Sequence, residues 1–140
     1  MTLAPAPLPV PSADADVLAV TKGHGTQNDF VLLDDRDGAL DLTPALVRRL
    51  CDRRAGVGGD GVIRLVASAL VPDAPHDAQG TAWFMDYRNS DGSEAQMCGN
   101  GVRVFARYAQ HLGLWDPADG PLEVGTRAGA RTVVASVPEV

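Results

Sequence analysis

The residues best suited to chemistry lie in the segment NSDGSEAQMCGNGVRVFARY, residues 89–108. Cys98 is followed there by Gly-Asn-Gly and then by a helical pattern, so we expect it at or just before a helix N-terminus. Free backbone N–H groups and the helix dipole favour negative charge at such a position, which lowers the pKa of a thiol. Gly99 and Gly101 leave those N–H groups unobstructed, and Asn100 adds a donor and an acceptor.

This arrangement suits removal of a proton next to a carboxylate. A carboxylate bound at the helix N-terminus is neutralised by hydrogen bonds, and a thiolate beside it takes the proton of the adjacent α-carbon. The developing charge spreads into the carboxylate, so the same donors stabilise the transition state more than the ground state. A second acid on the opposite face would return the proton with inverted configuration, which is racemisation or epimerisation without a cofactor. The spacing alone leaves open that Cys98 is an ordinary small buried thiol.

Two other motifs favour structural roles. Cys51 lies near the end of an amphipathic helical pattern, on the face of Val47, and the C-terminal end of a helix disfavours a thiolate. The loop AGVGGDG, residues 55–61, matches G-x-G-x-x-G, but it follows a helix and precedes a strand, which is the reverse of a dinucleotide-binding fingerprint. We interpret Asp60 in this loop as a turn or loop-anchoring carboxylate.

No metal site is predicted. His24, His76 and His111 have no ligand spacing among themselves or with the cysteines. His24 shares a segment with Asn28, so it either lines a site or is a hydrogen-bonded loop histidine. No cofactor is predicted either, because the chemistry above needs only acids, bases and hydrogen-bond donors.

Length and composition limit the class of protein. The 140 residues suffice for one domain with a core, and a hydrophobic content of 45% argues against general disorder. A net charge of −6 argues against a phosphate-backbone binder, so no nucleic-acid partner is expected. Two cysteines are too few for a disulfide framework, which favours free thiols and a cytoplasmic location. No stretch reaches the roughly 18 apolar residues of a membrane span, so no membrane partner is expected.

Hydrophobic patterns indicate the elements that must position Cys98. Strands are predicted over residues 17–22, 30–34, 62–66, 81–87, 122–126 and 132–137. One helix should run from residue 44 to residues 52–54 after an N-cap at Thr43. A second, residues 101–112, is apolar on nearly every face and should be buried. Residues 68–80 are predicted to be a surface excursion and residues 89–92 a turn. The fold class is therefore α+β, a mixed, strongly curved sheet wrapped around one buried central helix, rather than a βαβ alternation.

Three segments resemble a known family. KGHGTQNDFVLLD (residues 22–34), CDRRAGVGGDGVIRL (residues 51–65) and FMDYRNSDGSEAQMCGNGVRVFARY (residues 84–108) resemble, in order, signature segments of diaminopimelate epimerases. The last segment is highly specific, and the order and spacing of the other two add weight. The resemblance implies an enzyme independent of pyridoxal phosphate that interconverts LL- and meso-diaminopimelate by two-base proton transfer. That reaction serves lysine and peptidoglycan precursor biosynthesis.

The resemblance also implies roles for individual residues. Carried over position by position, Cys98 is the catalytic cysteine of the N-terminal domain. Gly99 and Asn100 would bind the α-carboxylate and the amino group beside it. Asn28 and Asn89 would bind other polar groups of the substrate.

The sequence departs from the family in two ways. The family often has a Gln that contacts substrate where this chain has Gly61. Family members also have a second, similar domain with its own cysteine in a Cys-Gly-Ser/Thr-Gly segment, and nothing after Gly113 matches that segment. We therefore expect a flexible Pro/Ala-rich tail (residues 1–16), the N-terminal epimerase domain (residues 17–126) and the start of a crossover into a missing C-terminal domain (residues 127–140). Such a chain should be inactive alone.

Two alternatives remain open. The chain is either half of an epimerase or a non-enzymatic half-module or split-enzyme subunit of the same fold, whose exposed inter-domain face would invite a homodimer. Related proline and hydroxyproline racemases use paired cysteines but typically have Cys-Gly-His where this chain has Cys98-Gly99-Asn100. Phenazine-type isomerases have a carboxylate at this place. Both departures favour diaminopimelate as the substrate.

Overall fold

The computed structural model describes residues 2–3, 18–96 and 99–135, and within these residues seven strands form one sheet in the order β1-β2-β3-β4-β5-β6-β7. The strands are β1 (Thr2–Leu3), β2 (Thr21–His24), β3 (Asp29–Asp34), β4 (Gly61–Ala67), β5 (Trp83–Asn89), β6 (Leu122–Thr126) and β7 (Gly129–Val133). The helices are α1 (Pro44–Cys51), α2 (His76–Gln79) and α3 (Gly99–His111), with 3₁₀ turns η1 (Ser68–Leu70) and η2 (Pro117–Asp119).

The sheet is mixed, as predicted. Strands β3 and β4 are parallel, as are β5 and β6, and the other neighbouring pairs are antiparallel. Parallel neighbours need a crossover connection, and the two crossovers contain α1 and α3 respectively. The α+β class is confirmed, but the sheet includes two βαβ connections, which the sequence interpretation had set aside.

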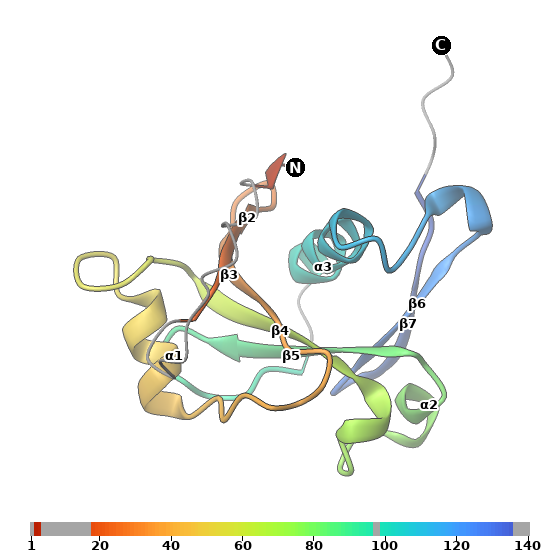
Figure 1. Cartoon of the computed structure of the whole chain (residues 1–140), viewed down its shortest axis with the longest axis horizontal. Helices are drawn as coiled ribbons and strands as arrows, with labels where there is room; N and C mark the ends of the chain where they lie inside the picture. The colour runs from red at the N-terminus through yellow and green to blue at the C-terminus, as the bar shows by residue number, and fades with distance from the viewer. Residues whose placement is uncertain (1, 4–17, 97–98, 136–140) are drawn as a thin grey trace.

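Helix α3 is the central helix, and the sheet bends around it (Figure 1). Strands β2 and β3 flank the helix on one side, and β6 and β7 flank it on the other (Figure 1). Inward side chains such as Phe30, Ile63 and Met85 form one core with Val104 and Phe105 of the helix. The buried central helix is therefore confirmed, although one stripe of it remains exposed, formed by Arg103, Arg107 and Gln110.

Helix α1 packs on the opposite face of the sheet. Thr43 caps it, with its Oγ1 accepting a hydrogen bond from the Leu46 N–H at 3.2 Å, and Pro44 begins it, as the sequence predicts. Val47 and Cys51 are buried against the outward side chains of β3 and β4, such as Val62. Successive side chains of a strand point to opposite faces of the sheet, so alternate residues of β3 and β4 belong to the α3 core and to the outer-face cores.

The segment of residues 68–80 lies at the surface, as predicted, but it is more ordered than an excursion. Its elements η1 and α2 cover the outer face near β5. Ala74 and Ala78 are buried there against Phe84 and Val66. Small alanines separated by polar residues carry a weak periodic signal, so the sequence pattern did not show this packing.

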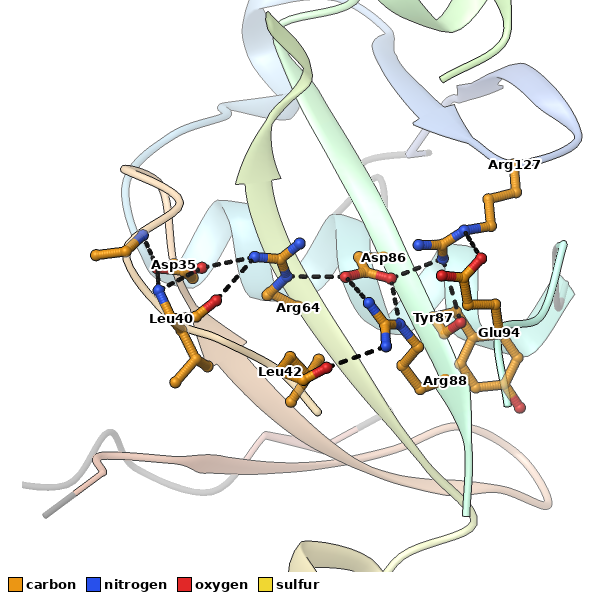
Figure 2. A network of polar contacts seen from close by, with 10 residues as sticks. Asp35, Leu40, Leu42, Arg64, Asp86, Tyr87, Arg88, Glu94 and Arg127 are labelled. Carbon is orange, nitrogen blue, oxygen red and sulfur yellow. Dashed lines mark hydrogen bonds and ion pairs between the residues drawn. The ribbon is translucent and has the colours of Figure 1, made fainter. Parts of the chain in front are cut away.

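Between the α1 and α2 cores, the outer face carries a buried polar network (Figure 2). Asp86, which is fully buried, contacts Arg64, Arg88 and Arg127 at 2.8, 2.8 and 2.6 Å. Burial alone would raise the pKa of Asp86, but the hydrogen bond from Arg88 and the charge of Arg127 bring it below its usual value. The network stands where an apolar core would otherwise continue.

The predicted tail, residues 1–16, lies outside the described residues except for Thr2–Leu3, which pairs with β2. The last strand, expected over residues 132–137, is Gly129–Val133. It pairs with β6 beyond the proposed boundary at residue 126, and the domain division itself stays a prediction. No helix in the described part of the chain is long and apolar enough to cross a membrane.

Candidate functional site

The candidate site lies at the end of the sheet where β3 and β4 begin and β5 ends, near the start of α3. Phe30 pairs with Gly61, and Gly61 pairs with Asn89, so the segments around these three residues adjoin. Helix α3 begins at Gly99, and the sequence therefore places Cys98 immediately before its first residue. Cys98 itself lies outside the described residues.

Asn100 and Asn28 are in direct contact although 72 residues separate them. The Nδ2 group of Asn100 donates a hydrogen bond to Oδ1 of Asn28 at 2.8 Å. The turn between β2 and β3 makes this approach possible, because the Gly25 N–H closes it onto the Asn28 carbonyl at 2.7 Å. A Cβ atom at Gly25 would lie 3.3 Å from the Cβ of Asn100. Two residues predicted to bind substrate therefore form one unit at the helix start.

Asp60 connects this unit to the glycine-rich loop. Its Oδ2 accepts from Nδ2 of Asn28 and from the Asp29 N–H, both at 3.2 Å. The Asp60 N–H in turn donates to the Asp29 carbonyl at 2.8 Å. The predicted loop-anchoring role of Asp60 is confirmed, and its contact with Asn28 is an addition that the sequence pattern did not show.

Lys22 and Arg53 form ion pairs with Asp29 and hold the glycine-rich loop against the start of β3. Arg53 forms a bidentate pair with Asp29 at 2.8 and 2.8 Å, and Lys22 lies 2.8 Å from the same carboxylate. Lys22 also donates to the Gly58 carbonyl. The hydrogen bond from Arg53 holds the pKa of the Asp29 carboxyl well below its usual range, against the opposing effect of burial.

Asn89 lies at the same sheet edge but has different partners. Its Nδ2 donates to Oγ of Ser93 at 3.1 Å, and its backbone N–H donates to the Ser93 carbonyl at 2.9 Å. These bonds close the turn predicted over residues 89–92, in which Gly92 has a positive φ of 94°. The described contacts therefore join Asn28 to Asn100, whereas Asn89 is tied to its own turn.

Gly61 lies where the backbone is closely packed. A Cβ atom there would lie 2.6 Å from the Arg88 carbonyl oxygen and 2.6 Å from Cε1 of Tyr87. A Gln side chain has no room in this backbone arrangement. Gly99 contrasts with Gly61, because a Cβ atom there would have no atom of the described residues within 4 Å.

Cys51 lies in the core on the face of the sheet opposite to α3. It is buried in the α1 core on the outer face of the sheet, and burial raises the pKa of its thiol. A thiol that resists ionisation is a poor base. The structural interpretation of Cys51 is confirmed. His24 is exposed at the end of β2, and the described residues contain no group of three or more side chains that could hold a metal.

An open pocket of about 440 Å³ borders the first residue of α3. Its lining includes Gly99, Trp115 and Val133 together with Arg103, Arg107 and Arg131. No acidic residue is among the described residues that line it. The pocket beside α3 is thus lined by basic residues, whereas Asp60 lies near the start of the helix on the side of Asn28.

These features define the class: a curved-sheet domain with a central helix that presents paired amide side chains at its N-terminus, directly after a cysteine. The diaminopimelate epimerase family model matches residues 20–138. The chain is 60% identical over 116 residues to the diaminopimelate epimerase of Streptomyces coelicolor, covering 83% of this chain and 39% of that protein. It is 61% identical over 117 residues to the diaminopimelate epimerase of Thermobifida fusca, covering 81% of this chain and 42% of that protein.

The diaminopimelate epimerase of Corynebacterium glutamicum is 54% identical over 112 residues, covering 80% of this chain and 39% of that protein. The chain belongs to the diaminopimelate epimerase family, as the three resembling segments indicated. It spans 39–42% of the length of these relatives.

Proposed function

We propose that this chain supplies one of the two acid/base half-sites of a cofactor-independent diaminopimelate epimerase. Cys98 acts as a thiolate that takes the α-proton from one epimer and as a thiol that gives a proton to the planar carbanion in the reverse direction. The second cysteine, on the opposite face of the α-carbon, comes from a domain outside this chain. The proton enters from the face opposite to the one it left, so the configuration at the α-carbon is inverted.

The contact between Asn100 and Asn28 is the observation that supports this proposal most directly. It joins two of the three segments that resemble the family at the start of α3, next to the position of Cys98. The N–H groups of Gly99 and Asn100 would bind the α-carboxylate, and the helix dipole would stabilise the charge that the carboxylate gains in the transition state. Asn28, Asn100 and Asn89 would bind the remaining polar groups of the substrate.

Cys51 does not supply the second base, because it is buried on the other face of the sheet with a raised thiol pKa. We therefore expect no turnover from this chain by itself. The reaction would belong to lysine and peptidoglycan precursor biosynthesis in the cytoplasm, where free thiols persist. The open face beside α3 would be covered by the second domain or, in its absence, by a second copy of the chain.

The test joins this chain to a domain that carries the second cysteine and follows the interconversion of LL- and meso-diaminopimelate. Cys98→Ala should abolish interconversion while the chain remains folded. Cys51→Ala is the matched control and should retain it, because that thiol lies outside the site. Interconversion that persists in Cys98→Ala would contradict the proposal. An inert wild-type assembly that still folds and pairs would instead favour the alternative of a non-enzymatic half-module.

A further inference from the structure

The hydrogen bonds of Asp60 determine which way the two amides beside it must face. A carboxylate offers only acceptor oxygens, so the group of Asn28 that faces Asp60 must be its Nδ2, and this is the observed contact at 3.2 Å. The Oδ1 of Asn28 then points away from Asp60 and can only accept. The group of Asn100 that meets it must therefore be Nδ2, as observed at 2.8 Å.

The carboxylate of Asp60 is itself held on both oxygens. Its Oδ2 also accepts from the Asp29 N–H at 3.2 Å, and its Oδ1 accepts from Arg53 at 3.2 Å. These contacts keep one carboxylate oxygen directed at Asn28. The polarity of both amides therefore follows from a charged group two hydrogen bonds away from the start of α3.

The consequence appears at Asn100, the second residue of α3. One N–H of Asn100 Nδ2 is engaged by Asn28, which leaves its Oδ1 and its second N–H, and none of the described residues donates a hydrogen bond to that oxygen. The first turn of α3 otherwise offers only backbone N–H donors. Asn100 Oδ1 is thus an acceptor placed next to a set of donors, which matches a ligand carrying an ammonium beside a carboxylate.

We propose that Asp60 is a positioning residue that acts through Asn28 to make Asn100 present its oxygen rather than its nitrogen. The ligand selected in this way carries a protonated α-amino group, which only donates hydrogen bonds. An α-keto acid of the same shape offers an acceptor at that place and would face the Asn100 oxygen unfavourably. This inference rests on the proposed function for the nature of the ligand, but the relay of hydrogen bonds does not depend on it.

NMR of the ligand-free chain tests the relay alone. Asp60→Ala removes the acceptor, so the side-chain NH₂ order parameters of Asn28 and Asn100 should both fall. Asp37→Ala is the matched control, since Asp37 is an exposed carboxylate outside these contacts and its loss should leave the Asn100 value unchanged. Continued protection of Cys51 from alkylation verifies that each variant is folded. A folded Asp60→Ala chain in which Asn100 keeps its order would overturn the proposal.

A measurement on the unaltered chain covers the case in which Asp60→Ala does not fold. The relay predicts that the side-chain NH₂ groups of Asn28 and Asn100 are both better ordered than the NH₂ group of the exposed Gln110. An Asn100 order parameter no higher than that of Gln110 would also overturn the proposal.

Competitive inhibition of the two-domain enzyme tests the consequence for ligand choice, with 2-aminopimelate and 2-oxopimelate as a matched pair. Asp60→Ala should reduce the preference for the amino compound about tenfold, because one hydrogen bond of fixed polarity is lost. Asp60→Asn keeps an oxygen for Asn28 and should retain most of the preference, and Asp37→Ala should retain all of it. A general loosening of the site would weaken both inhibitors equally, and that result would contradict the positioning role. If the wild-type enzyme showed no epimerisation, the proposed function would fail while the NMR result on the relay would stand.

Discussion

Arg127 lies with its Nη1 2.6 Å from Oδ1 of Asp86, so the turn between β6 and β7 is joined to the buried centre of β5 (Figure 2). The same guanidinium places its Nε 3.2 Å from Glu94, in the segment that leads toward Cys98. Glu94 is held a second time by its bridge to Arg88. The Arg127 guanidinium thus connects the last hairpin both to the buried centre of β5 and to the segment before the candidate site.

Asp86→Ala should destabilise the chain strongly, because it leaves Arg64, Arg88 and Arg127 without their shared buried counter-charge. Breaking a buried ion network from one side costs about 3–5 kcal/mol. Urea denaturation followed by circular dichroism measures the change in the free energy of unfolding. Glu94→Gln is the control, since the Glu94 side chain is 55% exposed and its pair with Arg127 should contribute less than about 1 kcal/mol. A loss at Asp86 no larger than that at Glu94 would contradict the assignment.

Acid should weaken the fold through Asp29 and Asp86. The folded-state pKa of each carboxyl lies below its usual value, so each binds fewer protons when folded than when unfolded. Their stabilisation is present above the unfolded pKa of about 3.9 and is lost as the pH falls below it. The urea midpoint should therefore drop as the pH falls below about 4. Asp29→Asn should flatten this dependence, and a midpoint that rises toward low pH would argue against it.

The two cysteines should differ sharply in their reactivity toward iodoacetamide. Cys51 is buried with a raised thiol pKa, so it should react only when the chain unfolds. Cys98 is proposed to be a thiolate at a helix N-terminus, so it should react first and at lower pH. Mass spectrometry of timed samples assigns the modified residue, and urea provides the unfolded reference for both. Faster modification of Cys51 in the native chain would refute the assignment of the two thiols.

Glycine replacements should separate a packing role from a role in the site. Gly61→Ala should destabilise the chain by about 1–3 kcal/mol, because its Cβ would lie 2.6 Å from the Arg88 carbonyl oxygen and from Tyr87. Gly99→Ala meets open space in the described structure, so stability should be unchanged or slightly higher.

In the two-domain enzyme, however, Gly99→Ala should reduce epimerisation, since a methyl group there would obstruct a ligand approaching the helix N–H groups. Thermal unfolding and the epimerisation assay, run on the same two variants, measure both effects. Equal stability of the two variants would contradict the packing argument at Gly61.

The sequence carried strong signals where the physical cause is local. Thr43 and Pro44 predict the start of α1, because capping acts within one turn. The observed helix begins at the predicted residue. The spacing of Val102, Phe105 and Ala109 likewise identified α3 as the central helix. Strand ends were less well predicted, because pairing with a neighbour decides where a strand stops.

The candidate site was predicted in its parts and not in its connections. Asn28 and Asn100 were both named from the sequence, yet their hydrogen bond and the role of Asp60 behind it were not. The sequence drew attention to Gly61, but its close packing against Arg88 and Tyr87 needed the neighbouring strand. Asn89, also named from the sequence, is held by Ser93 in its own turn.

The sequence by itself determined the family, the two helices of the crossovers and the placing of a cysteine directly ahead of a helix. Those features depend on residue identity and on periodicities that act over a few positions. The tertiary structure alone decided that β3 and β4 run parallel, that Arg127 reaches Asp86, and that Asn28 meets Asn100 across 72 residues. Such contacts form only when the sheet closes around α3, because their partners are brought together by the packing of the whole domain and not by any pattern near them in the chain.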